Sequence, residues 1–260
     1  MAGPVSREDV RTNLASWEAD SEAYQQRNRA QLNRWDLLGW GVWDIPEDHV
    51  GALGDVSGLD ALELGCGACQ LGIKVAMRGA RVMGLDFSAN QLRAAGPNFE
   101  ETGIRFPLVR GSAEELPFAD ASFDLIFCDH GALSFTDPAV TVPGCARVLR
   151  HGGFLVFNIA TPFISACWGD DEEPPRRELR RPYFGARRRV LVEETGPFVE
   201  FRPTYGEWVR LFRTCGLAIE DLIELRPPAD ADTTYTDFAP LAWARDFPGE
   251  HIWKLRKERS

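Results

Sequence analysis

The sequence is poor in the features that mark membrane, secreted and nucleic-acid-binding proteins. No apolar run approaches the roughly 20 residues of a membrane-spanning helix, and residues 1–11 are too polar for a secretory signal. The 39 Asp and Glu residues outnumber the 29 Lys and Arg residues, and a formal net charge of −10 disfavours binding to a phosphate backbone. We therefore expect a cytoplasmic protein that has neither a membrane nor a nucleic acid as its partner.

Cysteine is too scattered for a disulfide framework, which indicates a reducing compartment. The six cysteines stand at positions 66, 69, 128, 145, 167 and 215. Cys66 and Cys69 have the spacing of a redox or zinc pair, but no second Cys or His pair lies near them in the sequence. We therefore expect no metal site.

The sequence does contain a regular alternation of apolar runs and helical patterns, which predicts a parallel sheet covered by helices. At 260 residues and 44% hydrophobic content, we expect one substantial core with decorations. The predicted strands lie near 59–64, 81–86, 105–109, 123–128, 153–158, 217–225 and 250–256.

Four segments are expected along the chain. The N-terminal segment contains a helix from about 10 to 38. The segment after the core breaks the alternation with Pro, Arg and acidic clusters, and the last segment begins with a capping box at Thr204 and Glu207. The four segments are 1–50 as an N-terminal helical cap, 51–160 as the ligand-binding core, 161–203 as an inserted lid over the carboxyl edge of the sheet, and 204–260 as the helix and strands that complete the sheet.

A glycine turn and an acid at the ends of two successive strands predict a nucleotide-shaped ligand. Gly65 and Gly67 follow the apolar run at 59–64, and they allow a sharp turn whose backbone lies against a ligand. The helix that follows offers free N–H groups at its start. Asp86 ends the next strand, where it is placed to accept hydrogen bonds from both hydroxyls of a ribose.

The residues around this turn favour S-adenosylmethionine over a dinucleotide. The dinucleotide fingerprint requires a small residue at the sixth position from Gly65, and Gln70 stands there. No P-loop sequence occurs. Glu63, close before the turn, suits a ligand that carries positive charge. S-adenosylmethionine combines a sulfonium, an α-ammonium, a ribose diol and an adenine, and it has no phosphate.

Between Leu59 and Asn158 the chain resembles the class I S-adenosylmethionine-dependent methyltransferases, especially the small-molecule branch with the ubiquinone-biosynthesis-like domain. The resemblance implies a Rossmann-like α/β sheet that is mostly parallel, with an antiparallel last strand and helices on both faces. It rests on five motifs in the family's order, which are Leu62-Glu63-Leu64-Gly65-Cys66-Gly67, Gly84-Leu85-Asp86-Phe87-Ser88, Gly111-Ser112-Ala113-Glu114-Glu115-Leu116-Pro117-Phe118, Ser122-Phe123-Asp124-Leu125-Ile126-Phe127-Cys128 and Arg147-Val148-Leu149-Arg150-His151-Gly152-Gly153.

The family's pattern also implies which residues contact the cofactor. In two places this chain departs from it, with Ser112 where Asp is common and Cys69 where a third glycine is usual. Recognition of the adenine amino group would then rely on Ser112 or on backbone, and the turn would be less permissive. The expected cofactor contacts are Glu63, Gly65, Cys66, Gly67, Gln70, Asp86, Phe87, Ser88, Ser112, Ala113, Glu114, Cys128 and Asp129.

His130 is the best candidate for a general base. It follows the strand that the family places beside the transferable methyl group, and Asp129 next to it is an orienter or a cofactor contact. A base is needed only if the acceptor is protonated, since the sulfonium is already activated and alignment supplies most of the catalysis. Alternatively, and more commonly for such a residue, His130 only lines the pocket or packs against the sheet.

Aromatic residues near the N-terminus offer a cover for the cofactor. Tyr24 and Trp43 would present an aromatic face to the sulfonium, although ordinary helix packing explains such residues equally well. We therefore predict methyl transfer from S-adenosylmethionine to an O, N or C atom of a small-molecule acceptor by a monomer or homodimer. The alternatives are a catalytically silent S-adenosylmethionine-binding protein and, less favoured, a nicotinamide-dependent oxidoreductase.

Overall fold

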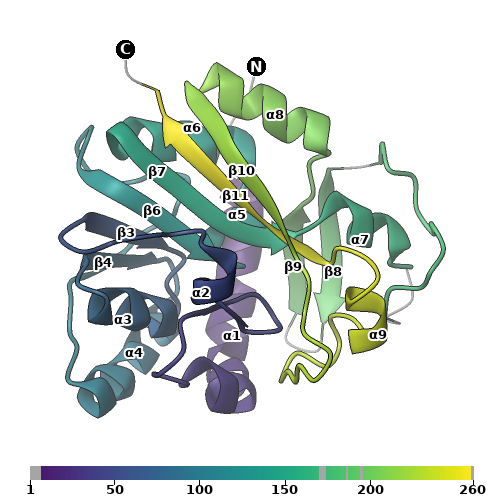
Figure 1. Cartoon of the computed structure of the whole chain (residues 1–260), viewed down its shortest axis with the longest axis horizontal. Coiled ribbons are helices and arrows are strands. Elements are labelled where there is room, and N and C mark those ends of the chain that lie inside the picture. The colour runs from purple at the N-terminus through teal and green to yellow at the C-terminus, as the bar shows by residue number, and fades with distance from the viewer. Residues whose placement is uncertain (1–6, 170–173, 186, 194–195, 259–260) are drawn as a thin grey trace.

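A twisted seven-stranded sheet forms the centre of the molecule (Figure 1). The computed structural model describes residues 7–169, 174–185, 187–193 and 196–258. Six strands run in one direction, and β11 (Glu250–Lys257) is antiparallel to both of its neighbours. This confirms the mostly parallel sheet with an antiparallel last strand. In spatial order the strands are β10 (Leu217–Leu225), β11 (Glu250–Lys257), β7 (Leu149–Ala160), β6 (Phe123–Asp129), β3 (Asp60–Leu64), β4 (Arg81–Asp86) and β5 (Leu108–Arg110).

Helices cover both faces of the sheet at its centre, which explains why the central strands β3 and β6 read as nearly continuous apolar runs. In β6, Leu125 and Phe127 enter one apolar cluster, whereas Ile126 and Cys128 enter the other. This alternation follows from the two-residue period of a strand. The larger helices on the two faces are α3 (Gln70–Met77), α4 (Ala89–Thr102), α6 (Pro138–Val148) and α8 (Tyr205–Thr214).

The capping box predicted from Thr204 and Glu207 is present at the start of α8. The Thr204 side chain accepts a hydrogen bond from Glu207 N, and the Glu207 carboxylate accepts one from Thr204 N at 2.8 Å. The helix buries Trp208 and Phe212 against the sheet beside β10 and β11. The cap therefore fixes where the chain turns into the last part of the sheet.

The N-terminal segment folds as one long helix followed by a small hairpin. The helix α1 (Arg7–Leu32) ends six residues before the predicted end at 38, and turns follow it. Next come β1 (Gly39–Trp40), β2 (Ile45–Pro46) and α2 (Glu47–Val50). The buried carboxylate of Glu47 holds this segment together, because it accepts hydrogen bonds from Trp40 Nε1 at 2.6 Å and from Leu53 N at 2.7 Å.

The segment predicted as a lid over the carboxyl edge of the sheet packs against α1 and against α5 (Ala132–Phe135), which follows the end of β6. It contains α7 (Pro162–Cys167) and a hairpin of β8 (Arg188–Glu193) and β9 (Gly196–Phe201). Asn13 of α1 accepts a hydrogen bond from Val199 N at 2.7 Å and donates to the carbonyl of Phe135, in α5. Residues 170–173, 186 and 194–195 of the predicted lid lie outside the described residues.

A long connection between β10 and β11, which contains α9 (Leu241–Ala244), completes the fold. Its Thr233 hydroxyl donates to the carbonyl of Val42, and Thr234 N donates to Gln31 Oε1 at 2.9 Å. The connection is thereby tied to α1 and to the β1–β2 turn. Within the described ranges, no helix combines the length and apolar character needed to cross a membrane.

Candidate active site

A cavity of about 400 Å³ lies at the carboxyl edge of the parallel strands. Ligand pockets in proteins usually have volumes of about 300 to 1,000 Å³. Its walls come from the ends of β3, β4 and β6, from α1, from the β1–β2 turn, and from Tyr235 and Phe238 of the β10–β11 connection. Among the described residues of 161–203, none lines it. The cavity is thus covered by α1 and by the C-terminal connection, and the latter was not predicted.

The glycine turn between β3 and α3 has the conformation that its sequence demands. Gly65 and Gly67 have φ values of 74° and 51°, in the left-handed region. A Cβ on Gly65 would also collide with the backbone nitrogen of Ala132. Cys69 reaches the left-handed region without being glycine, with φ 63°, and it is fully buried. The turn therefore stays sharp although Cys69 replaces the family's usual third glycine.

Asp86 connects the end of β4 to this turn. Its Oδ2 accepts a hydrogen bond from Gly67 N at 2.9 Å, and its Oδ1 accepts one from Ser88 N at 2.8 Å. Burial raises the pKa of Asp86, and the hydrogen bonds from backbone N–H groups oppose that rise. The carboxylate lines the cavity, so it both shapes the turn and faces a ligand.

Glu63 and Gln70 also lie where the sequence predicts them. Glu63 Oε2 accepts a hydrogen bond from Gly72 N at 3.1 Å, and burial raises its pKa well above the ordinary range. Gln70 Nε2 donates to Gln25 Oε1 of α1 at 2.6 Å, and Gln25 Nε2 donates to Gln91 Oε1 of α4 at 2.9 Å. This chain of amides ties α1 to the two helices that flank the glycine turn.

The cavity brings together most of the residues predicted to bind the cofactor. Those on its wall are Tyr24, Glu63, Gly65, Cys66, Gly67, Gln70, Asp86, Phe87, Ser112, Ala113 and Asp129. His130, the predicted base, also lines the cavity.

Four residues predicted as cofactor contacts do not line the cavity. Trp43 packs in an apolar cluster, because Val42 and Asp44 on either side of it take the cavity face of the β1–β2 turn. Ser88 is fully buried and caps α4 by accepting from Gln91 N. The last two are Glu114, which accepts from Asp137 N, and Cys128, whose position in β6 points into the apolar cluster beneath.

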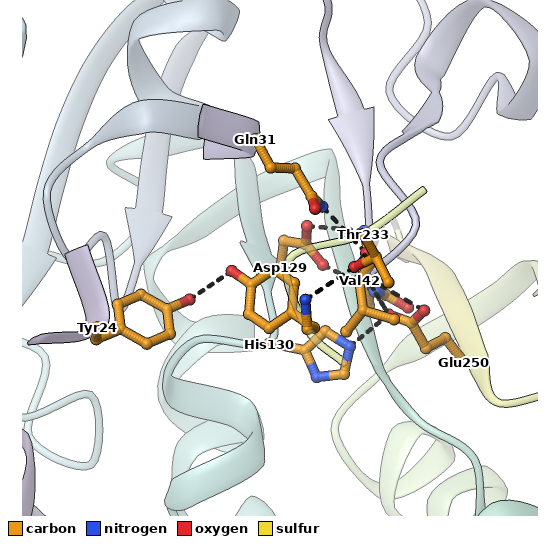
Figure 2. A network of polar contacts seen from close by, with 10 residues as sticks. Tyr24, Gln31, Val42, Asp129, His130, Thr233 and Glu250 are labelled. Atoms are coloured by element: carbon orange, nitrogen blue, oxygen red, sulfur yellow. Dashed lines mark hydrogen bonds and ion pairs between the residues drawn. The ribbon is translucent and has the colours of Figure 1, made fainter. Parts of the chain in front are cut away.

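His130 is paired with a glutamate from the far end of the chain. Its Nε2 lies 2.5 Å from Oε1 of Glu250, the first residue of β11 (Figure 2). Burial opposes the charged ring, but the hydrogen bond to Glu250 and the charges of Glu250 and Asp129 outweigh it, so the pKa of His130 is raised. His130 has φ 47°, which is unusual for a residue other than glycine. The strained backbone places the ring beside this buried carboxylate.

Asp129 does not orient His130, contrary to one of its two predicted roles. Its Oδ2 accepts a hydrogen bond from Gly41 N at 2.9 Å, and its Oδ1 accepts one from Asn158 Nδ2 at 2.7 Å. Asn158 also donates to Glu250 Oε1 at 3.0 Å. Figure 2 shows Asp129, His130 and Glu250 gathered beside Val42, whose N–H donates to Glu250. Glu250 and Asn158 were missed, because only strand pairing brings them beside β6.

Two tyrosines and a phenylalanine form the wall next to His130. The hydroxyls of Tyr24 and Tyr235 lie 2.7 Å apart, and burial raises the pKa of Tyr24 to about 12. The ring of Phe238 meets the His130 ring edge to face, with centroids 5.8 Å apart. Tyr24 was predicted to cover the cofactor. Tyr235 and Phe238 were not predicted to reach the site, because they stand in the β10–β11 connection and only the fold brings that connection beside His130.

Among the residues that the structure describes, two groups of donors lie close enough to hold a metal ion, with ligand atoms within 4.8 Å of one another. In the first, the Glu63 carboxylate is engaged by Gly72, and hydrogen bonding and burial raise the pKa of the Cys66 thiol. In the second, the carboxylates and the imidazole already bond to each other or to protein N–H groups. Hydrogen bonds within the protein therefore account for both groups, which are Glu63, Cys66 and Cys69, and Asp129, His130 and Glu250.

The sheet order and the cavity beside the glycine turn define a Rossmann-like α/β protein with a site for a nucleotide-type ligand. Residues 62–157 match the family model described as a methyltransferase domain. A ubiquinone biosynthesis O-methyltransferase of Hahella chejuensis is 34% identical over 112 residues, which are 43% of this chain and 47% of that protein. Another, of Aromatoleum aromaticum, is 33% identical over 143 residues, which are 50% of this chain and 61% of that protein.

The chain thus spans about half to three-fifths of the length of these curated relatives. An S-adenosylmethionine-dependent methyltransferase structure from Mesorhizobium loti is 26% identical with a TM-score of 0.62, covering 79% of this chain and 94% of that one. A second structure, of a putative S-adenosylmethionine-dependent methyltransferase from Listeria monocytogenes, is 16% identical with a TM-score of 0.65. The match covers 82% of this chain and 98% of that one, and it shows the shared fold. These matches identify residues 62–157 as a class I S-adenosylmethionine-dependent methyltransferase domain, as the motifs predicted.

Proposed function

We propose that the chain transfers a methyl group from S-adenosylmethionine to a small-molecule acceptor. The observation that carries this proposal is the position of Asp86, which lines the cavity while it holds the glycine turn. The cavity wall also contains the carboxyl groups of Asp44, Glu63 and Asp129. A wall rich in acidic groups suits a cationic sulfonium and disfavours the phosphates of a dinucleotide.

The residues on the wall fit the parts of this cofactor. Ser112, Ala113 and Phe87 follow β5 and β4, where they would hold the adenine, and Asp86 would accept from the ribose hydroxyls. Gly65 and Gly67 line the cavity with the backbone of the turn, so a ligand would lie against that backbone. The bound cofactor supplies a methyl group already activated by the positive sulfur.

His130 is suited to take a proton from the acceptor. An ionised Glu250 carboxylate can only accept, so Nε2 of His130 carries the hydrogen between them, and Nδ1 is left as the basic atom. No hydrogen bond within the described part of the chain engages Nδ1, and 28% of the side chain is exposed. As a proton arrives at Nδ1, the Glu250 carboxylate stabilises the resulting imidazolium.

An oxygen acceptor fits this arrangement best. A hydroxyl must lose its proton during methylation, which is the task that His130 can perform. The curated relatives are named as O-methyltransferases, although the chain covers only part of their length. We propose that the acceptor is a small molecule, that the protein acts in the cytoplasm without a nucleic acid or membrane partner, and that it is a monomer or homodimer.

A thermal-shift panel and a transfer assay test this function. S-adenosylhomocysteine at 100 times its dissociation constant should stabilise the protein by about 2.7 kcal/mol, and nicotinamide dinucleotides should not stabilise it. The protein is then incubated with S-adenosylmethionine and a panel of phenols, hydroxy compounds and amines, with methylated product measured by mass spectrometry. Stabilisation by a dinucleotide alone would overturn the proposal, and cofactor binding without turnover on any acceptor would favour a silent binding protein.

A further inference from the structure

A buried cation, Lys74, faces the cavity without a partner of opposite charge at contact distance. Lys74 stands in α3, is 6% exposed and lines the cavity wall. No hydrogen bond or ion pair between described residues engages its ammonium group. Burial lowers the pKa of Lys74, and Asp44 and Asp129 oppose that effect from a distance.

A buried ammonium group without a partner lowers the stability of the protein when no ligand is bound. Burial of a charge without a partner is strongly unfavourable, and proteins rarely keep a lysine inside unless something compensates it. A cavity-facing position makes a ligand the natural source of the compensating charge. Because Lys74 has only donors and no acceptor, the ligand group must be an acceptor, and an anionic oxygen satisfies both its charge and its hydrogens.

Asp44 places a negative charge near Lys74 on the same part of the wall. It stands in the β1–β2 turn, lines the cavity, and forms an ion pair with Arg34 at 3.1 Å. Burial raises the pKa of Asp44, and the charges of Lys74 and Arg34 oppose the rise. The wall therefore offers a cation and an anion close together, which is the pattern that a zwitterionic amino acid requires.

The position of Lys74 on its helix directs it toward the glycine turn. It comes one helical turn after Gln70, and side chains on a helix lean toward the N-terminus. The N-terminus of α3 joins Gly67 and its neighbours, whereas Asp86 and Ser112 follow the next two strands. A ligand whose ribose lies at Asp86 and which passes the glycine turn would extend its other end toward Lys74.

We propose that Lys74 binds the α-carboxylate at the amino-acid end of S-adenosylmethionine, with Asp44 suited to the α-ammonium beside it. The inference rests on the proposed function, because it assigns a residue to one end of the same cofactor. Charge-assisted hydrogen bonds of this kind fix orientation as well as affinity. Lys74 would thus set the position of the sulfur along the cavity and align the methyl group with the acceptor.

Two ligands and two lysine variants test this assignment. S-adenosylhomocysteine carries the amino-acid end, whereas 5′-methylthioadenosine keeps the adenine and ribose and lacks that end. The variant Lys74→Met should bind S-adenosylhomocysteine about 10- to 100-fold more weakly than wild type, and its affinity for 5′-methylthioadenosine should be unchanged. Lys254→Met makes the same chemical change in β11, outside the cavity wall, and should alter neither affinity.

Three other outcomes would each overturn the assignment. Equal binding of S-adenosylhomocysteine by Lys74→Met and wild type would remove Lys74 from the cofactor site. If that affinity is unchanged while the KM of an acidic acceptor rises, the carboxylate belongs to the acceptor. Equal losses for both ligands would mean that Lys74 only supports the fold. By contrast, failure of wild type to bind S-adenosylhomocysteine would reject the proposed function itself.

Discussion

Glu250 and His130 are 120 residues apart in the sequence, yet Oε1 of the first lies 2.5 Å from Nε2 of the second. The antiparallel direction of β11 explains this proximity. Because β11 runs against its neighbour β7, its first residue lies at the carboxyl edge of the parallel strands. Glu250 is 2% exposed there and also accepts hydrogen bonds from Val42 N and Asn158 Nδ2. The last strand therefore supplies a buried charge to the site as well as closing the sheet.

We expect Glu250→Gln to move the pH dependence of methyl transfer to lower pH. If His130 is the base, transfer requires its neutral form, and the rate should rise with pH through the pKa of His130, which Glu250 raises. Without the carboxylate, burial and the charge of Arg202 lower that pKa, and Asp129 alone opposes them. The plateau rate should also fall, because the imidazolium loses its counter-charge. The measurement is kcat against pH, and an unmoved profile would contradict the pairing.

The same pair should make stability depend on pH with a definite sign. The folded-state pKa of His130 lies above the unfolded value of about 6.5. Its stabilising effect is therefore fully present below about pH 6.5 and is lost as the pH rises through the folded-state pKa. Urea unfolding of wild type and His130→Ala should show a stability difference that shrinks as the pH rises. A difference that grows with pH would show that the ring is neutral in the folded protein.

His130→Ala distinguishes a base from a residue that only lines the pocket. If His130 takes the acceptor's proton, the variant should lose about 10²–10⁴-fold in the transfer step. Its affinity for S-adenosylhomocysteine should be nearly unchanged, because the proposal assigns binding of the donor to Asp86 and the glycine turn. A saturated rate within a few-fold of wild type would eliminate the base, and alignment alone would then have to account for catalysis. A raised KM with the same pH profile would indicate a lining role.

The parts of the fold that depend on neighbouring residues were predictable from the sequence. The strand predicted at 217–225 coincides with β10, and the capping box at Thr204 is present. In these cases, the pattern of apolar residues and the hydrogen bonds from side chain to backbone depend only on residues a few positions apart in the sequence. The same reasoning placed Asp86 and the glycine turn in one site, because the carboxyl ends of parallel strands share an edge.

Contacts between distant segments account for what the sequence did not reveal. Glu250 reads as an ordinary charged residue at the start of a predicted strand, and nothing in the sequence marks Lys74 as facing a cavity. Trp43 was predicted to cover the cofactor, but it packs in an apolar cluster while its neighbours Val42 and Asp44 line the cavity. The sequence of the β1–β2 turn does not indicate which of its residues face the cavity. Tyr235 reaches Tyr24 only because the β10–β11 connection folds back on α1.

We expect Gln25→Ala to loosen the cover that α1 forms over the cavity. Gln25 is the middle member of the amide chain from Gln70 to Gln91, so its removal breaks this link from α1 to α3 and α4. The hydrogen bonds of Glu18 and Arg29 to α4 remain in the variant. Amide hydrogen exchange in α1 should become faster, and S-adenosylhomocysteine should dissociate faster. The adjacent Gln26 is exposed, so Gln26→Ala is a matched control that should change neither rate. Equal behaviour of the two variants would contradict a role for the amide chain.

Asp86→Ala should lower the affinity for S-adenosylhomocysteine by roughly 2–4 kcal/mol, if two hydrogen bonds to a charged group are lost. The structure adds a second effect, because the variant also leaves Gly67 N and Ser88 N without the carboxylate that they now contact. Unfolding by urea should therefore show a lower stability as well. The exposed Asp230 provides a control, since Asp230→Ala should change neither quantity.

Asp86→Asn separates the two effects of removing Asp86. The amide oxygen can still accept from one backbone N–H, but the side chain no longer offers a negative charge to a ribose. If direct binding dominates, Asp86→Asn should retain most of the stability and still lose most of the affinity measured by titration calorimetry. If the carboxylate acts only by shaping the turn, affinity should recover together with stability. Affinity equal to wild type in Asp86→Ala would remove Asp86 from the site, and the glycine turn alone would then have to hold the ribose.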